Sequence, residues 1–224
     1  MTGLVLSFII PTLNEEEHLG AVLDRITEEL QGRLAYEVIV VDNGSVDRTV
    51  HIAEEKGAKT LILPGCTIST LRNEGVQAAS ADVLVFLDAD VYLGKGWGEL
   101  IPEVIEKLNR SKNIITGSIY GISLENNWIE RSWFAPRVAA KEMNYINGGH
   151  LILHRELFSA VGGFSPKYET GEDYEFCARA RRMQAQIVND PRMHVIHAGY
   201  PKSVWSFFTR ERWHARGDCA SLRT

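Results

Sequence analysis

Short apolar runs alternate with amphipathic segments through the first half of the chain. Runs rich in β-forming residues cover positions 4–10, 36–41, 59–63 and 83–87, and each run predicts a strand. Apolar side chains recur at helical spacing from Leu19 to Leu30, around Val50 and Ala53, and from Ser69 to Ala79. Strands that are apolar on both faces and alternate with helices are typical of a parallel sheet covered on both sides. The pattern therefore predicts a mostly parallel, Rossmann-like α/β sheet flanked by helices.

Polar residues mark the ends of these expected elements. Pro11 is expected to end the first strand, and Asn14 with Glu17 three positions later has the spacing of a capping box for the first helix. The second strand runs into Asp42-Asn43-Gly44-Ser45, which is a turn sequence. Because ligands of open α/β sheets bind beyond the carboxyl ends of the strands, a site is expected at these polar ends.

The second half of the chain has a different pattern. Strands are predicted at 114–119, 151–154 and 193–197, with longer and more polar connections, and a helix is predicted to open at Glu172-Asp173. No repeat, low-complexity segment or flexible linker interrupts the 224 residues. We therefore expect one domain over 1–224, with a nucleotide-binding half at 1–112, an acceptor half at 113–200 and a C-terminal helix at 201–224.

Composition narrows the class of protein. The chain is 45% hydrophobic and 24% charged, as ordinary globular proteins are, and its net charge of −5 argues against binding of nucleic acid. The apolar runs are too short to span a bilayer, and Met1-Thr2-Gly3 lacks the basic start of a secretory signal. Three widely spaced cysteines form no CxxC pair. We expect a reduced, cytoplasmic compartment and no zinc site built from cysteines.

The signatures of several nucleotide-binding classes are missing. No GxGxxG follows the first strand, the chain has no GxxxxGK[ST], and the glycine-rich loop of a sugar nucleotidyltransferase is absent after strand one. Instead, Asp88-Ala89-Asp90 follows the apolar run at 83–87. Two carboxylates two positions apart at a strand end can reach one hard cation, and Mg²⁺ or Mn²⁺ favours such oxygen ligands. The alternative interpretation is a turn in which an aspartate caps the next segment.

Six motifs occur in one order between about residues 4 and 199, nearly the whole chain. They are IPTLNE at 10–15, VVDNGSVDRT at 40–49, RNEG at 72–75, FLDAD at 86–90, the glycine pairs at 148–149 and 162–163, and GED at 171–173. In this set the chain resembles the family 2 inverting nucleotide-sugar glycosyltransferases, which have the GT-A fold. The chain departs from their pattern at Asn43, where the usual motif has a second Asp.

The resemblance implies a nucleotide-diphosphate sugar donor, a hydroxyl acceptor, and Mg²⁺ or Mn²⁺ as cofactor. It implies that Asp173 is the general base, with Gly148, Gly149 and Glu172 on the acceptor side. It also implies that Asp42 accepts a hydrogen bond from the nucleotide base. The implied nucleotide-binding residues are Pro11, Thr12, Asn14, Glu15, Asp42, Arg72 and Asp88, and the implied metal ligands are Asp88, Asp90 and His197.

Several of these residues also have a purely structural interpretation. Asp42 could hold a turn, Glu15 could interact with a helix dipole, and Arg72 could be a solvated helix arginine. His197 could be a packing residue at a strand end, and Asp173 could cap its own helix.

Aromatic and basic residues gather in two further segments. Trp128, Trp133 and Phe134 lie on an expected helix, where they either stack on a sugar or pack in the core. The segment 202–224 interleaves four aromatic residues with Lys202, Arg210, Arg212, Arg216 and Arg223. Such a helix could lie on an anionic membrane surface, close over a diphosphate or pack on the domain. A lipid-linked acceptor and a peripheral position at the inner face of a membrane are therefore suggestions.

Two other functions are open at the level of sequence. The first is a non-catalytic nucleotide-sugar-binding protein, but such a protein has no reason to keep both Asp88/Asp90 and Glu172-Asp173. The second is a sugar nucleotidyltransferase, which would form or consume pyrophosphate. The resemblance implies transfer of a sugar with inversion.

Overall fold

The computed structural model describes residues 5–121 and 144–198 together with Trp205 and Phe208. Its centre is a seven-stranded sheet with the order β3-β2-β1-β4-β8-β6-β9. Within this sheet only β8 runs antiparallel to its neighbours, β4 and β6. The strands are β1 (Leu6–Thr12), β2 (Tyr36–Asp42), β3 (Lys59–Ile62), β4 (Val83–Leu87), β6 (Ile114–Gly117), β8 (His150–His154) and β9 (Gln186–Asn189). The predicted mostly parallel α/β sheet is confirmed.

A second, three-stranded sheet lies beyond the carboxyl end of β4. It has the order β5-β10-β7, formed by β5 (Val91–Leu93), β10 (Val195–His197) and β7 (Tyr120–Gly121). β10 pairs antiparallel with β5, so that His197 lies opposite Val91. The small sheet therefore brings the end of the described chain next to Asp88-Ala89-Asp90.

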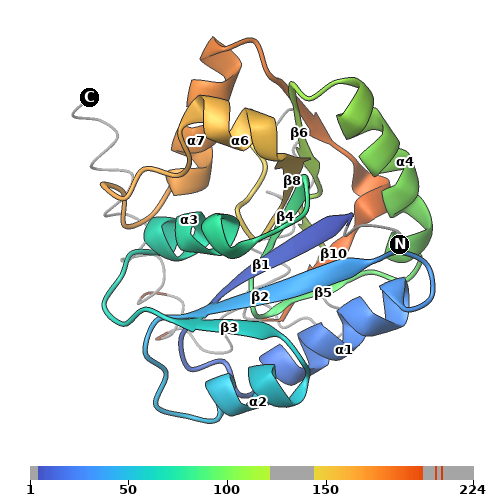
Figure 1. Ribbon diagram of the computed structural model, residues 1–224. Helices are drawn as coiled ribbons and strands as arrows, with labels where there is room; N and C mark the ends of the chain where they lie inside the picture. The colour runs from blue at the N-terminus through green and yellow to red at the C-terminus, as the bar shows by residue number, and fades with distance from the viewer. Residues whose placement is uncertain (1–4, 122–143, 199–204, 206–207, 209–224) are drawn as a thin grey trace.

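Helices cover both faces of the large sheet (Figure 1). The side chain of Phe8 packs with α1 (Leu19–Leu30), α2 (Thr49–Glu55) and α4 (Trp97–Arg110). The next residue, Ile9, points to the other face, which carries α3 (Ile68–Ala78), α6 (Arg155–Val161) and α7 (Glu172–Arg182). Both side chains are fully buried, and burying an aliphatic or aromatic side chain contributes roughly 1.5–3 kcal/mol. Double-sided burial explains why the strands are apolar without alternation.

The first strand does not end at Pro11 as expected, because β1 continues to Thr12. It pairs with β2 along its whole length but with β4 only as far as Ile9. Beyond Ile9 there is no partner in β4, so the missing N–H of proline breaks no ladder bond on that side.

The predicted capping box at Asn14 is also wrong. The helix α1 begins at Leu19, and its cap, His18, makes no side-chain capping bond. Asn14 has a φ of 56°, a left-handed conformation that asparagine tolerates better than most residues. Its side chain accepts a hydrogen bond from the Val46 N–H at 2.9 Å, and its own N–H donates to Ser45 Oγ at 2.8 Å. Asn14 therefore ties the loop after β1 to the loop after β2.

Several elements were not expected from the sequence: β5, β7, β9, α4 and α6. The expected strand at 193–197 is shorter, because residues Pro191–Met193 form a 3₁₀ turn before β10. For α4 a signal exists in the apolar residues at helical spacing, Ile101, Val104, Ile105 and Leu108. No helix within the described ranges has the length and apolar character needed to cross a bilayer.

Candidate active site

The loops after β1 and β2 form one hydrogen-bonded unit around Asp42. This carboxylate is fully buried; one oxygen accepts from Thr12 Oγ1 at 2.9 Å, and the other accepts from the backbone N–H groups of Gly44 and Ser45. The hydroxyl of Ser45 donates a further bond to it. The structural role of Asp42 in the turn is therefore present, and its contact with a nucleotide base stays a prediction.

Asn43, which replaces the second Asp of the usual motif, links β2 to the segment after β3. Its amide nitrogen donates to the Cys66 carbonyl at 3.1 Å, and its amide oxygen accepts from the Cys66 N–H at 2.9 Å. A carboxylate has no donor for the first of these bonds. The substitution therefore serves the fold locally.

Glu15 lies near both acids of Asp88-Ala89-Asp90. Its N–H donates to Thr49 Oγ1 at 2.7 Å, and its side chain is half-buried. Burial, followed by the charges of Asp90 and Asp88, raises the pKa of Glu15 to about 7. The interpretation of Glu15 as an acid in the first turn of a helix is wrong, since α1 starts at Leu19. This edge of the sheet thus gathers three carboxylates.

The two acids after β4 have different partners. Asp88 accepts a hydrogen bond from Arg72 Nη2 at 2.9 Å on one oxygen and from the Tyr120 hydroxyl at 3.1 Å on the other. Asp90 Oδ2 lies 3.3 Å from His197 Nε2. Burial raises the pKa of Asp90, although the nearby His197 works in the opposite direction. The two acids therefore contact different protein groups, and their sharing of one cation stays a prediction.

Asp90 and His197 are the described residues best placed to hold a metal ion. Within residues 5–121 and 144–198, no three His, Cys, Asp or Glu side chains converge as a ready-made metal centre. A carboxylate beside an imidazole is a donor set that suits Mn²⁺ or Mg²⁺, and such ions commonly take further oxygens from substrate phosphates. The pair therefore fits a cation that is completed by a diphosphate.

Arg72 is enclosed by the protein, so its interpretation as a solvated helix arginine is wrong. Only 2% of the residue is exposed. Its guanidinium pairs with Asp88 at 2.9 Å and with Glu172 at 2.5 Å, and it lies 5.5 Å from the centre of the Phe164 ring. Burial alone would lower the pKa of Arg72, but Asp88 and Glu172 raise it above its ordinary value. Arg72 therefore joins the end of β4 to the start of α7.

Asp173 lies beside this ion pair and is held by backbone N–H groups. Oδ2 accepts from the Gly148 N–H at 3.0 Å, and Oδ1 accepts from the Tyr174 N–H at 2.7 Å. Burial, followed by the Glu172 carboxylate, raises the pKa of Asp173 to about 6, while the Gly148 bond and Arg72 oppose the shift. A carboxylate with such a pKa is mostly ionised at neutral pH and still able to accept a proton.

Gly148 and Gly149 have no room for a side chain. A Cβ at Gly148 would lie 2.6–2.8 Å from the guanidinium atoms of Arg72. A Cβ at Gly149 would lie 2.1 Å from the Tyr120 hydroxyl and 2.2 Å from Asp88 Oδ2. The two glycines let the backbone before β8 press against the buried ion pairs.

Tyr120 is a site residue that the sequence did not reveal. Its hydroxyl donates to Asp88, and its ring stacks on His197 with centroids 5.0 Å apart. The available signal was position, because Tyr120 directly follows the expected strand 114–119, at a strand end where site residues are expected. The aromatic residues Trp128, Trp133 and Phe134 lie outside the described residues. So does the segment 201–224, apart from Trp205 and Phe208, which are exposed.

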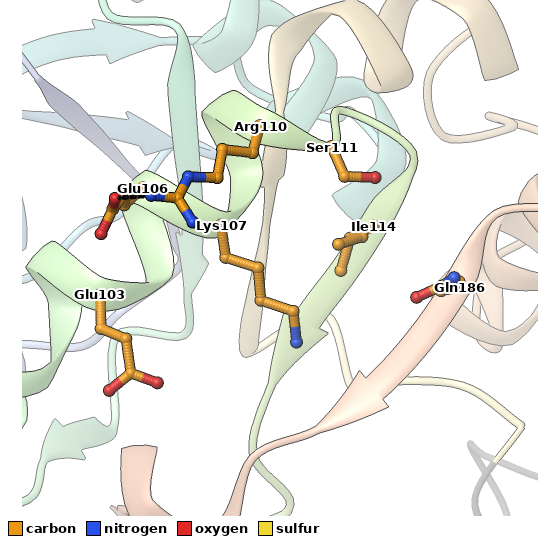
Figure 2. Close-up of a pocket in the computed structure, with 7 residues that line it drawn as sticks. All are labelled: Glu103, Glu106, Lys107, Arg110, Ser111, Ile114 and Gln186. Carbon is orange, nitrogen blue, oxygen red and sulfur yellow. Dashed lines mark hydrogen bonds and ion pairs between the residues drawn. The ribbon is translucent and has the colours of Figure 1, made fainter.

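A hollow of about 410 Å³ lies elsewhere on the molecule (Figure 2). It opens beside the end of α4, at the starts of β6 and β9, and charged side chains line much of it. Because β6 and β9 run parallel to β4, this is the opposite edge of the sheet from the site. Its lining residues are Glu103, Glu106, Lys107, Arg110, Ser111, Ile114 and Gln186.

Comparison with known proteins identifies the family. A dolichol-phosphate mannosyltransferase of Pyrococcus furiosus is 38% identical over 165 residues, which are 70% of this chain and 44% of that protein. A PGL/p-HBAD biosynthesis glycosyltransferase of Mycobacterium bovis is 27% identical over 89% of this chain and 78% of its own length. This chain thus spans less than half of the mannosyltransferase that it matches.

The fold is shared with solved glycosyltransferase structures. A mannosyltransferase of Pyrobaculum calidifontis, in complex with GDP-Man and Mn²⁺, superposes with a TM-score of 0.73 at 17% identity. The match covers 98% of this chain and 64% of that one, and it confirms the expected GT-A type fold. Residues 7–170 match the sequence profile of glycosyl transferase family 2. The chain belongs to glycosyl transferase family 2.

Proposed function

We propose that this chain is a metal-assisted, inverting glycosyltransferase that moves a sugar from a nucleotide diphosphate to an acceptor. One observation carries the proposal: Arg72 pairs with Asp88 after β4 and with Glu172 at the start of α7. This bridge supports the proposal because it links Asp88, expected at the diphosphate, to Glu172, the neighbour of the expected base Asp173. Family membership and the named activities of the relatives support sugar transfer.

The nucleotide is proposed to bind at the carboxyl ends of β1 and β2. Pro11 and Thr12 end β1, Asp42 ends β2, and Asn14 fixes the two following loops to each other. Glu15 completes this group on the side of Asp88 and Asp90. In this proposal Asp42 accepts a hydrogen bond from the nucleotide base while its carboxylate still holds the turn. Pro11, Thr12, Asn14 and Glu15 line the base and the ribose.

The divalent ion is proposed to be held by Asp90 and His197, and when bound it neutralises charge on the diphosphate leaving group. Asp88 is kept in the proposal as a nucleotide and metal contact. Both of its oxygens already accept hydrogen bonds, from Arg72 and Tyr120, so ligation would add to these bonds or replace one of them. A structural neighbour with the same fold binds GDP-Man and Mn²⁺, which supports a divalent cofactor.

Asp173 is proposed to take the proton of the acceptor hydroxyl as its oxygen attacks the anomeric carbon from the face opposite the leaving group. The pairing of Glu172 with Arg72 supports this choice, because the charge of Glu172 is engaged by the guanidinium, whereas Asp173 accepts backbone N–H groups of Gly148 and Tyr174. The pKa of Asp173 near 6 suits a base at neutral pH. The related dolichol-phosphate mannosyltransferase makes a lipid-linked acceptor a reasonable candidate.

The test is a panel of UDP-, GDP- and dTDP-sugars, each with and without Mn²⁺, read by thermal shift and by release of the nucleotide diphosphate. We expect one donor to raise the melting temperature by mass action and to release its nucleotide only with metal. Binding of a donor without release of its nucleotide, whichever acceptor is added, would favour a non-catalytic binding protein. Formation or consumption of pyrophosphate would favour a sugar nucleotidyltransferase.

A further inference from the structure

Three segments that are distant in the chain meet on the Arg72 side chain. Arg72 lies on α3, Asp88 follows β4, Glu172 starts α7, and Gly148 precedes β8. Asp88 and Glu172 each form an ion pair with the guanidinium. The backbone of Gly148 lies against the guanidinium, since a Cβ on Gly148 would lie within 2.8 Å of it. A fourth segment contributes Phe164, whose ring centre lies 5.5 Å from Arg72 Cζ.

The same contacts fix the direction of Asp173. Adjacent residues of a helix point about 100° apart, so the ion pair that draws Glu172 toward Arg72 turns Asp173 to another side. There Asp173 accepts the N–H of Gly148, the residue whose backbone lies against the guanidinium. The position of the expected base therefore depends on Arg72 through two paths, the Glu172 ion pair and the Gly148 backbone.

We propose that Arg72 is a positioning residue that fixes Asp173 relative to the donor-side acid Asp88, rather than a group that binds the nucleotide itself. The inference rests on the proposed function, for which Asp173 is the base. A guanidinium fork can serve two carboxylates at once because its N–H groups diverge in one plane. A lysine ammonium at this position keeps the charge but not the planar fork, so it should hold one carboxylate and release the other.

The kinetic test compares Arg72→Lys with the wild-type chain. We expect kcat to fall about 10- to 100-fold, as misplacement of a catalytic group does, with the donor KM changed less than about threefold. The matched control is Arg179→Lys on α7, since Arg179 also pairs with a carboxylate, Glu175, and lies 5.6 Å from a phenylalanine ring. We expect this control to change the melting temperature and to leave kcat close to wild type. A donor KM raised tenfold or more at unchanged kcat would show direct nucleotide binding and overturn the inference.

A second measurement needs no activity, so it separates this inference from the proposed function. Hydrogen exchange of the backbone is followed in peptides covering 144–151 and 170–176 in the metal-free protein. Arg72→Lys should speed exchange in both peptides, whereas Arg179→Lys should leave the first unchanged. Equal exchange in Arg72→Lys and the wild type would overturn the inference, even if sugar transfer is confirmed. Faster exchange in a protein without transferase activity would uphold the positioning contacts and reject the proposed function.

Glu172→Gln keeps the inference testable if Arg72→Lys does not fold. It retains Arg72 and removes the charge of one partner, so we expect the same loss of kcat at constant donor KM and faster exchange in 170–176. Where both variants fold, the double variant should be less impaired than the product of the single effects, because both substitutions break one contact. Strict multiplication of the effects, or no effect of Glu172→Gln on kcat and exchange, would overturn the inference.

Discussion

Replacement of Asp173 by asparagine separates the chemistry of a base from the geometry of its helix. The carboxylate accepts one N–H on each oxygen, from Gly148 and from Tyr174. An asparagine side chain has a single acceptor oxygen, so one of these hydrogen bonds is lost. A hydrogen bond to a charged group contributes about 1.5–3 kcal/mol net, and its loss lowers the stability of the folded state.

Loss of a positioned base, in contrast, lowers the rate of the folded enzyme. Removal of a general base typically lowers turnover by about 10²–10⁴-fold, or roughly 2.7–5.4 kcal/mol. We therefore expect Asp173→Asn to lower kcat by at least about 100-fold while donor affinity, measured by calorimetry, stays within a few-fold. Glu175→Gln is the control, because it removes an acid of the same helix that pairs with Arg179. Its kcat should stay near the wild-type value.

The pH dependence of the rate provides an independent test of Asp173 as the base. Burial raises the pKa of Asp173 to about 6, and the ionised form is the one that accepts a proton. The rate of the wild type should therefore fall as the pH is lowered through about 6, and this limb should be absent from the residual rate of Asp173→Asn. A loss of tenfold or less in Asp173→Asn would refute its role as base. If Glu172→Gln were inactive in addition, the two acids would have exchanged roles, and if neither variant mattered, the mechanism would be wrong.

Three further outcomes follow from the same geometry. Gly149→Ala should destabilise the chain by about 1–3 kcal/mol in urea unfolding, because its Cβ would overlap the Tyr120 hydroxyl. The control is Gly20→Ala on α1, which should be neutral or stabilising because the nearest atom to its Cβ lies 3.4 Å away. His197→Ala should weaken Mn²⁺ binding at least tenfold by calorimetry in the presence of a nucleoside diphosphate, and unchanged affinity would remove His197 from the metal site. Glu15→Gln should raise the melting temperature of the metal-free protein at pH 8 and not at pH 4. The folded-state pKa of Glu15 is raised to about 7, so its ionisation destabilises the folded protein as the pH rises through that value, and glutamine removes this cost.

The centre of the sheet could be predicted from the sequence because β1, β4 and β8 are buried on both faces. Consecutive residues such as Phe8 and Ile9 pack into different cores, so the apolar runs are continuous. The elements that escaped prediction differ in kind: α4 carried a helical pattern that was overlooked, whereas the shortest strands carried none. β5 and β7 have three and two residues, and such lengths carry too few positions for a periodic pattern.

The contacts of the site could not be predicted in the same way. The burial of Arg72 arises from Gly148, Phe164 and Glu172, which are 76 to 100 positions away in the chain, and no local pattern around Arg72 marks it as enclosed. The spacing of Asn14 to Glu17 fits a helix cap, but its left-handed backbone and its bond from the Val46 N–H tie it to the loop after β2. The motifs predicted the residues of the site, but tertiary packing determines the contacts that each residue makes.

The spacing of Asp88 and Asp90 did not predict which protein groups the two acids contact. The sequence placed them at a strand end entering a turn, and the turn between β4 and β5 directs them to different neighbours. Asp88 pairs with Arg72, which also pairs with Glu172, the neighbour of the proposed base Asp173, and Asp90 lies beside His197. Tyr120 contacts both groups: its hydroxyl donates to Asp88, and its ring stacks on His197, the neighbour of Asp90. A change at either acid should therefore affect the other acid through Tyr120. Loss of the Tyr120 hydroxyl should loosen Asp88 and leave the contact between Asp90 and His197 in place.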